Sequence, residues 1–187
     1  SITMLGRDGE MNLALDRWKT ACSGEGQVVL ITGEPGIGKS YMTERLVGAI
    51  SATGVVPVRL DCSPFQQSTA LHPVIHRLRA SAGILDADEP QAQLAKLHDH
   101  LQSLNADADM AMPCLARLLS LPAEDWPEPE DTTPMIRKAR TFAALTAIAL
   151  ARMQAGPAVF VLEDAHWADP TTLEYFERLM DASRNQP

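Results

Sequence analysis

Apolar residues recur at helical spacing near the start of the chain, at Met11, Leu15, Trp18 and Cys22. Charged residues occupy the positions between them, so we expect this segment to lie as a helix on a core. The next segment, QVVLIT at 27–32, is a short and nearly unbroken apolar run. Such a run is typical of a strand that is buried on both faces in a parallel sheet.

Two further apolar runs predict strands, VVPVRLD at 55–61 and AVFVL at 158–162. Helical patterns separate the three runs, and the first of them covers about Lys39 to Thr53. Strands that alternate with helices are the signature of crossover connections in a parallel sheet. We therefore predict an α/β protein.

The middle of the chain is long for a simple crossover. Three helical patterns follow one another there, in ALHPVIHRLRASAGI, PQAQLAKLHDHLQSL and MPCLARLLSL, before a Pro- and acid-rich loop at 122–134 that we expect to be exposed. A longer helix at 135–154 leads into the third strand. We interpret 71–134 as a helical insertion within one domain that covers residues 1–187.

The composition narrows the function. The 187 residues carry a formal charge of −8, which argues against a broad surface for direct nucleic-acid binding. There is no apolar stretch of membrane-spanning length and no basic-then-apolar leader, so we expect a cytoplasmic protein without a membrane contact. The three cysteines are widely spaced and form no CxxC pair, which favours reduced thiols over a disulfide framework or a zinc site.

A glycine-rich motif lies where the first strand should meet a helix. Its eight residues match G-x-x-x-x-G-K-[ST] without a gap: Gly33, Glu34, Pro35, Gly36, Ile37, Gly38, Lys39 and Ser40. Backbone N–H groups can wrap a polyphosphate only where residues tolerate unusual φ and ψ, and we assign this need to Gly36 and Gly38. The helix N-terminus adds positive charge. This motif, with Tyr41 directly after it, predicts a nucleotide site.

The chemistry of such a site assigns a role to each polar group. Lys39 is expected to reach the β- and γ-phosphates, and the Ser40 hydroxyl to ligate Mg²⁺. A second half is predicted after the third strand, where Glu163 and Asp164 follow the apolar run. One carboxylate should serve Mg²⁺ and the other should orient the attacking water. Counting from the strand assigns Mg²⁺ to Glu163 and water to Asp164, but a shift of one residue exchanges them.

Three segments carry a resemblance to a known family. Together with the motif at 33–40, LGRDGEM (5–11) and EDAHWADP (163–170) resemble the ATPase module of the STAND branch of AAA+-related P-loop NTPases. RLDCSPFQQSTALHPVIHRL (59–78) is similar to the ATPase regions of bacterial class III adenylate/guanylate cyclase proteins and large LuxR-type regulators. The resemblance covers nearly the whole chain.

The resemblance implies a three-layer P-loop NTPase fold, ATP and Mg²⁺ as ligands, and Arg7 near the nucleotide base. It also implies that His166 belongs to the family pattern, either as a γ-phosphate sensor or as a hydrogen-bonded loop histidine. One departure is Glu163 where many relatives have Asp. Asp169, which precedes a proline, is most simply an N-cap.

These observations favour a switch module that binds ATP–Mg²⁺, hydrolyses it slowly and regulates an attached output, such as a nucleotide cyclase or a transcription regulator. A small-molecule kinase shares the P-loop, but no arginine-rich lid is evident in the sequence. A nonhydrolysing nucleotide-binding scaffold is the other alternative, and the intact Lys39, Ser40 and acidic pair argue against it.

Relatives of this branch insert a further strand between the first and third strands. This chain ends at DASRNQP (181–187), one helix past the third strand, so we expect a fold truncated there. Either 27–32 and 158–162 flank an empty position in the sheet, or they pair directly. Exposed strand edges then predict self-association and a weak or inactive ATPase.

Overall fold

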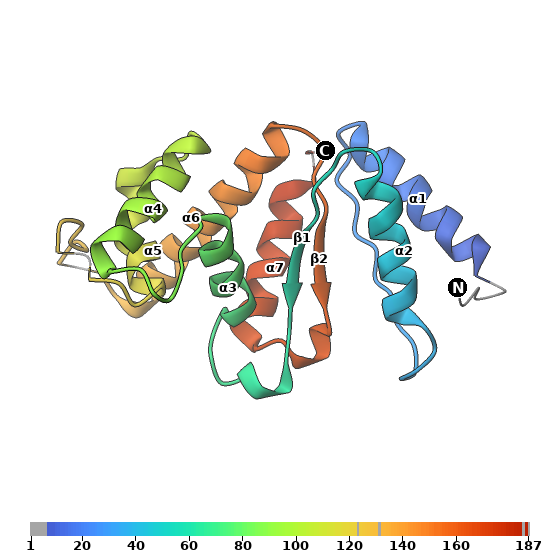
Figure 1. The fold of residues 1–187 in the computed structure, drawn as a ribbon, viewed down its shortest axis with the longest axis horizontal. Helices are drawn as coiled ribbons and strands as arrows, with labels where there is room; N and C mark the ends of the chain where they lie inside the picture. The colour runs from blue at the N-terminus through green and yellow to red at the C-terminus, as the bar shows by residue number, and fades with distance from the viewer. Residues whose placement is uncertain (1–6, 123, 131, 185, 187) are drawn as a thin grey trace.

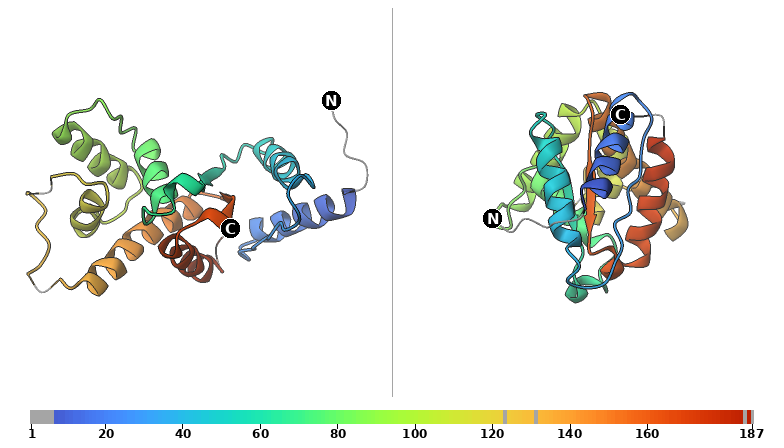
Figure 2. Two further views of the ribbon diagram at one scale, coloured as in Figure 1. Left: turned by 90° about the horizontal axis from the view of Figure 1, so that it is seen from below. Right: turned by 90° about the vertical axis from the view of Figure 1, so that its right-hand side faces the viewer.

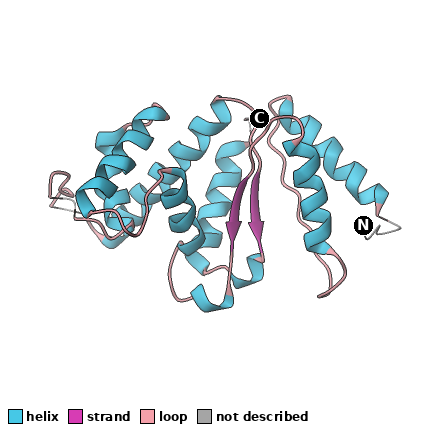
Figure 3. Ribbon diagram, viewed as in Figure 1, coloured by secondary structure: helices cyan, strands magenta, loops and turns pink. Residues whose placement is uncertain are grey.

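The computed structural model describes residues 7–122, 124–130, 132–184 and 186, and helices dominate it (Figures 1 and 3). The helices are α1 (Asp8–Cys22), α2 (Lys39–Ser51), α3 (His72–Ser81), α4 (Pro90–Ser103), α5 (Ala108–Leu118), α6 (Pro134–Gln154) and α7 (Pro170–Ser183). The strands are β1 (Val58–Asp61) and β2 (Phe160–Glu163), and two short 3-10 turns are η1 (Pro64–Gln66) and η2 (Ala165–Trp167). The helices predicted from the sequence are confirmed.

The two strands form a parallel pair in which Val58 lies opposite Phe160 and Asp61 lies opposite Glu163. Val58 and Leu60 are buried in the pair, as the alternation of side chains along a strand requires. The strands predicted at 55–61 and 158–162 are therefore present; both begin later than predicted, and β2 ends one residue later. Because the strands are parallel, their carboxyl ends meet at one edge, where the acidic residues Asp61 and Glu163 lie side by side.

The predicted strand at 27–32 is wrong for this structure. The segment is extended but pairs with no strand among the described residues, and the sheet has the order β1–β2 alone. Val28 is 64% exposed and Leu30 is 80% exposed. An apolar run favours burial, but a strand also needs a neighbour for its N–H and C=O groups. Figure 1 shows the segment beside α1 and α2, beyond β2.

The expected three-layer fold with a parallel sheet is therefore present only in part. The described part of the chain holds a partial parallel sheet of two strands. Direct pairing of 27–32 with 158–162, one of the two arrangements considered above, does not occur among the described residues, where β2 pairs with β1 alone and its other edge carries no strand.

The main core lies between the sheet and helices α3 to α7. Its most deeply buried side chains include Leu97, Leu101, Met112, Leu115 and Phe142. The long helix α6 packs against both α5 and α7, so it joins the helical insertion to the strand-bearing part. In the part of the chain that the structure describes, no residue before Val58 belongs to this core cluster.

Helices α1 and α2 pack on each other through a small apolar contact of their own, with Met11, Ala14, Met42, Val47 and Ile50 buried. Figure 2 shows this pair set apart at one end, and its links to the rest of the molecule include two polar contacts, one from the segment after α1 and one from α2 itself. In one link, the N–H of Gly26 donates to the carbonyl of Arg184 at 3.0 Å. In the other, Glu44 of α2 pairs with Arg59 of β1.

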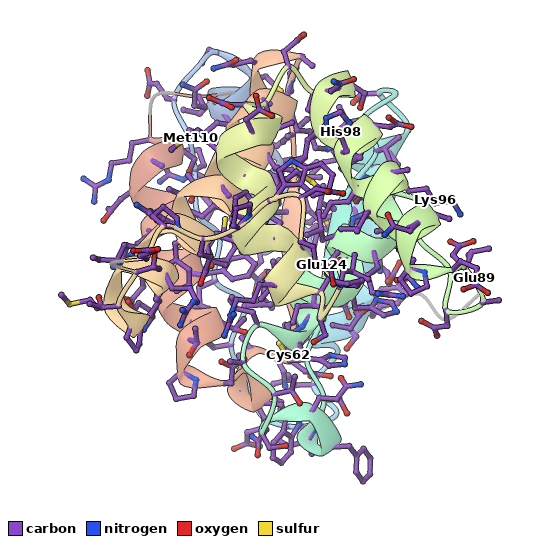
Figure 4. All side chains as sticks on the ribbon, turned by 90° about the vertical axis from the view of Figure 1, so that its left-hand side faces the viewer. Cys62, Glu89, Lys96, His98, Met110 and Glu124 are labelled. Carbon is purple, nitrogen blue, oxygen red and sulfur yellow. The ribbon has the colours of Figure 1, made fainter. Side chains whose placement is uncertain are left out.

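Most of the described residues of the loop at 122–134 are exposed, as the sequence predicts, but two of its side chains are anchored. Trp126 packs against the core cluster, and the Glu128 carboxylate accepts hydrogen bonds from Arg137 Nε at 2.9 Å. Figure 4 views this side of the molecule, with Lys96 and His98 on α4 and Met110 on α5. No helix in the described ranges combines the length and the hydropathy that crossing a bilayer requires.

Candidate functional site

The glycine-rich loop adopts a backbone that glycine allows most readily. The φ angles of Gly33, Gly36 and Gly38 are +153°, +81° and +93°. Gly38 caps α2 in the left-handed conformation. A Cβ on Gly36 would meet nothing within 4 Å, so the backbone angle and not the space around it requires glycine there. Gly36 and Gly38 therefore have the unusual φ angles that the sequence analysis expects of them.

Lys39 folds back across this loop. Its Nζ donates to the carbonyl oxygens of Gly33 at 2.9 Å and Glu34 at 3.0 Å. Both acceptors are neutral carbonyl oxygens of the loop itself. Ser40 is exposed one residue further along α2.

The start of α2 is open to an anion. Within α2, which is described throughout, the first turn has no acidic residue, and Gly38 supplies no side-chain cap. The first N–H groups of a helix have no partner inside the helix and carry partial positive charge. A lysine ammonium, a serine hydroxyl and free N–H groups on one exposed loop fit the phosphates of a nucleotide and the oxygen preference of Mg²⁺.

The predicted acids lie at the carboxyl end of β2. The Glu163 carboxylate is 3.1 Å from Arg59 Nη1, and the same guanidinium donates from Nη2 to Glu44 at 2.8 Å. Burial raises the pKa of Glu163, and the charge of Arg59 opposes this shift. Asp164 follows in the left-handed conformation, with φ of +51°, and is exposed.

The two halves of the predicted site face the same end of the molecule without touching. In Figure 1 the loop before α2 lies at the lower end, as do the carboxyl ends of β1 and β2. Neither Lys39 nor Ser40 has a hydrogen bond or ion pair with Glu163 or Asp164 among the residues that the structure describes. Because 27–32 does not pair with β2, no sheet fixes the separation of the two halves.

The other residues singled out in the sequence lie in different places. Arg7 precedes α1, and its carbonyl accepts from the N–H of Met11 at 3.1 Å. Helix α1 begins at one end of the molecule, away from the strands (Figures 1 and 2), so Arg7 is not brought to the acids. His166 and Trp167 lie in η2 with ring centroids 4.8 Å apart.

Asp169 is the N-cap that the sequence predicts. Its Oδ1 accepts from the N–H groups of Thr171 at 2.9 Å and Thr172 at 3.0 Å. Its Oδ2 also accepts from the N–H of Leu71 at 3.2 Å, and the carboxylate is buried. Asp169 therefore joins the start of α7 to the start of α3, a contact that no local pattern indicates.

Sequence reasoning missed two residues of this region. Arg59 bridges α2 and β2, and its only signal is a charge in the middle of an apolar strand. Cys62 follows β1, and burial, with Asp169, Asp164 and Asp61 nearby, raises the pKa of its thiol to about 11. The Cys62 thiol is therefore protonated at neutral pH and is not a nucleophile.

Comparison with known proteins agrees with this geometry. The family model described as "AAA ATPase domain" matches residues 3–187. An uncharacterised protein of Rhizobium meliloti (strain 1021) is 30% identical over 172 residues, which are 90% of this chain. The chain spans only 16% of the length of that relative. No solved structure matches the chain significantly.

Proposed function

Because this chain belongs to the AAA ATPase domain family, we propose that it binds ATP and Mg²⁺ as the switch module of a longer protein and hydrolyses ATP slowly. The observation that carries the proposal is the loop at 33–40. There, positive-φ glycines, the Lys39 ammonium and the open start of α2 converge on one exposed surface.

Each residue has a distinct part in this proposal. Residues 33–38 offer backbone N–H groups, and Lys39 exchanges its two carbonyl partners for phosphate oxygens. Ser40 supplies a hydroxyl ligand for Mg²⁺, which when bound would offset the negative charge of the phosphates. Glu163 and Asp164 divide the remaining work between metal and water, in an order left open. Tyr41 and Arg7 lie next to the nucleotide in this proposal.

The ion pair between Glu163 and Arg59 supports slow turnover. A carboxylate that is held by a guanidinium must leave that partner before it can act elsewhere. The same contact favours a second candidate function, a scaffold that binds nucleotide without hydrolysing it. The two functions differ only in whether phosphate is released.

We further propose that nucleotide occupancy controls an output domain of the longer protein, a nucleotide cyclase or a transcription regulator. The length of the Rhizobium meliloti relative supports a multidomain parent. The exposed side chains of Val28 and Leu30 support self-association, because an unpaired apolar segment can pair with another chain. The net charge of −8 favours protein partners over direct contact with nucleic acid. We also propose that the protein is located in the cytoplasm.

The test is calorimetric titration with ATP, with and without MgCl₂, beside a phosphate-release assay. Lys39→Ala should weaken ATP binding tens- to hundredfold, since a charged contact contributes about 2–3 kcal/mol. Lys19→Ala is the matched control, because Lys19 pairs with Asp16 on the exposed face of α1. Equal affinity of the Lys39→Ala variant and the parent chain would overturn the nucleotide assignment.

The acidic pair separates hydrolysis from binding alone. Glu163→Gln and Asp164→Asn should differ in kind: the variant that lacks the metal-serving carboxylate changes its Mg²⁺ dependence. The other variant binds ATP normally and stops releasing phosphate. Tight ATP binding without phosphate release by the unsubstituted chain would favour the scaffold instead.

A further inference from the structure

A cavity separate from the loop at 33–40 lies where the two strands meet α3, α6 and α7. It has a volume of about 230 Å³ and is bounded by β1, β2, α3, α6, α7 and the end of α4. Its walls are mainly apolar, with Leu60, Leu78, Ile148, Phe160 and Phe176 among them. It shares no residue with the loop at 33–40.

Three basic side chains interrupt these apolar walls. Arg77 from α3, His100 from α4 and Arg152 from α6 all line the cavity. The structure has five buried side-chain nitrogen or oxygen atoms without a hydrogen-bond partner in its described part, and three of them are Arg77 Nε, His100 Nε2 and Arg152 Nε. Buried polar groups in folded proteins nearly always have a partner, and the position of these three atoms at one cavity allows a single ligand to provide it.

The charge of the cavity is also uncompensated. Across the described residues, neither Arg77 nor Arg152 forms an ion pair with a carboxylate. Desolvation and the nearby charge of Arg152 lower the pKa of Arg77, and desolvation and Arg77 lower that of His100. Arg152 Nη2 donates to the Val56 carbonyl at 2.6 Å, which holds this guanidinium at the start of β1.

We propose that this cavity binds a small amphipathic carboxylate. The carboxylate accepts hydrogen bonds from Arg77, Arg152 and His100, and the apolar body lies against the aromatic and aliphatic walls. Guanidinium groups recognise planar carboxylates by paired hydrogen bonds. A bound carboxylate would therefore offset the cost of placing two arginines at an apolar site. The volume is below that of typical pockets for drug-sized ligands, roughly 300–1,000 Å³, so the body is short.

Octanoate is a suitable probe, with n-octanol and octylammonium as matched ligands of the same chain length. Calorimetry and thermal unfolding of the 187-residue chain should show that octanoate binds and raises the melting temperature. Octanol should bind at least about tenfold more weakly because it lacks the charge-assisted contacts, and octylammonium should not bind. Equal binding of octanoate and octanol, or no binding of octanoate, would overturn the proposal. These arms need no variant.

The Arg77→Gln variant supplies an independent arm. It should bind octanoate about tenfold or more weakly than the parent chain, while its melting temperature without ligand stays the same or rises, because an unpartnered cation is removed. Arg79→Gln is the control, since Arg79 on the same helix pairs with Asp86 at the surface. Undiminished octanoate binding by a folded Arg77→Gln variant would refute the assigned contact. Neither the ligand series nor the Arg77→Gln comparison depends on ATP binding, so both can succeed or fail independently of the proposed nucleotide site.

Discussion

Residues 7–57 and the chain from Val58 onward are held together by different means. The later region has one continuous core in which α3 to α7 and both strands take part. The earlier region has two helices, a glycine-rich loop and an extended segment whose Val28 and Leu30 side chains are exposed. The difference separates two tasks, because the later region has the buried area that drives folding and the earlier one carries the chemistry of the phosphate loop.

The comparison shows how the glycine-rich phosphate loop at 33–40 can keep its shape without a sheet beside it. Glycines with positive φ, the helix cap at Gly38 and the bonds from Lys39 to its own loop are all local. Local contacts form without long-range pairing, whereas a strand requires a neighbour. The phosphate loop is therefore present although 27–32 is not a strand.

The largest expected difference between the regions comes from truncating one leucine in each. Leu115→Ala removes a side chain with 0% exposure and should lower the free energy of unfolding by about 2–5 kcal/mol. Leu30→Ala, at a side chain that is 80% exposed, should change it by less than about 0.5 kcal/mol. Urea denaturation followed by circular dichroism measures both. Comparable losses would mean that residues 27–32 are packed in solution.

A smaller effect is expected at the two aspartate caps. Asp169→Ala should cost about 2 kcal/mol, because it removes a helix cap and leaves the buried N–H of Leu71 without its acceptor. Asp107→Ala removes the bond to the Met110 N–H on an exposed helix start and should cost about 1 kcal/mol or less. If both variants have the same melting temperature, the link between α7 and α3 contributes nothing.

Hydrogen exchange should resolve the two regions without any substitution. Amides of α2 are expected to exchange through openings of lower free energy than amides of α5 and α6, because the described residues of α2 lie outside the main core cluster and its largest packing contact is with α1. Mass spectrometry of peptides from 39–51 and 134–154 makes the comparison. Equal protection of the two peptides would show one cooperative unit, contrary to the division drawn here.

The smallest effect is a pH dependence at the junction of the regions. The folded pKa of Glu163 is raised above its ordinary value of 4.5, mainly by burial, so its ionisation costs stability as the pH rises. Glu163→Gln should therefore gain stability relative to the parent chain between pH 4 and pH 7. Glu128, whose pKa is lowered by Arg137, should show the opposite sign in Glu128→Gln, with its loss largest at pH 7.

Urea midpoints of the three chains at several pH values test these signs. Arg59→Met should enlarge the effect at Glu163, because the positive charge that lowers the pKa is gone. A Glu163→Gln difference that shrinks from pH 4 to pH 7 would contradict the buried setting of this carboxylate.

The sequence allowed prediction of those features that depend on near neighbours. Helix α6 is an example, since apolar spacing and a start at Thr133 and Pro134 are both visible in the letters. The angles of Gly36 and Gly38 are another. The state of 27–32 was not predictable, because its apolar pattern is that of a strand and only the absence of a neighbour among the described residues makes it an extended segment.

Contacts between distant residues were equally hidden. Arg59 meets Glu163, which lies 104 positions further along the chain, and Leu71 meets Asp169, 98 positions away. Leu71 also has φ of +59° without being glycine, which no turn rule indicates from this sequence. The convergence of Arg77, His100 and Arg152 comes from three helices and exists only once those helices pack.

Gly26 sets a limit on which sequences this fold accepts. A Cβ built on this residue would lie 2.1 Å from the carbonyl oxygen of Ser183, so backbone meets backbone there and no side chain can move aside. Mutational tolerance at position 26 should therefore be among the lowest of any loop position, although the residue is part of neither proposed binding site. In a library of variants selected only for solubility, depletion of even alanine at this position would record the close approach of the chain to the end of α7.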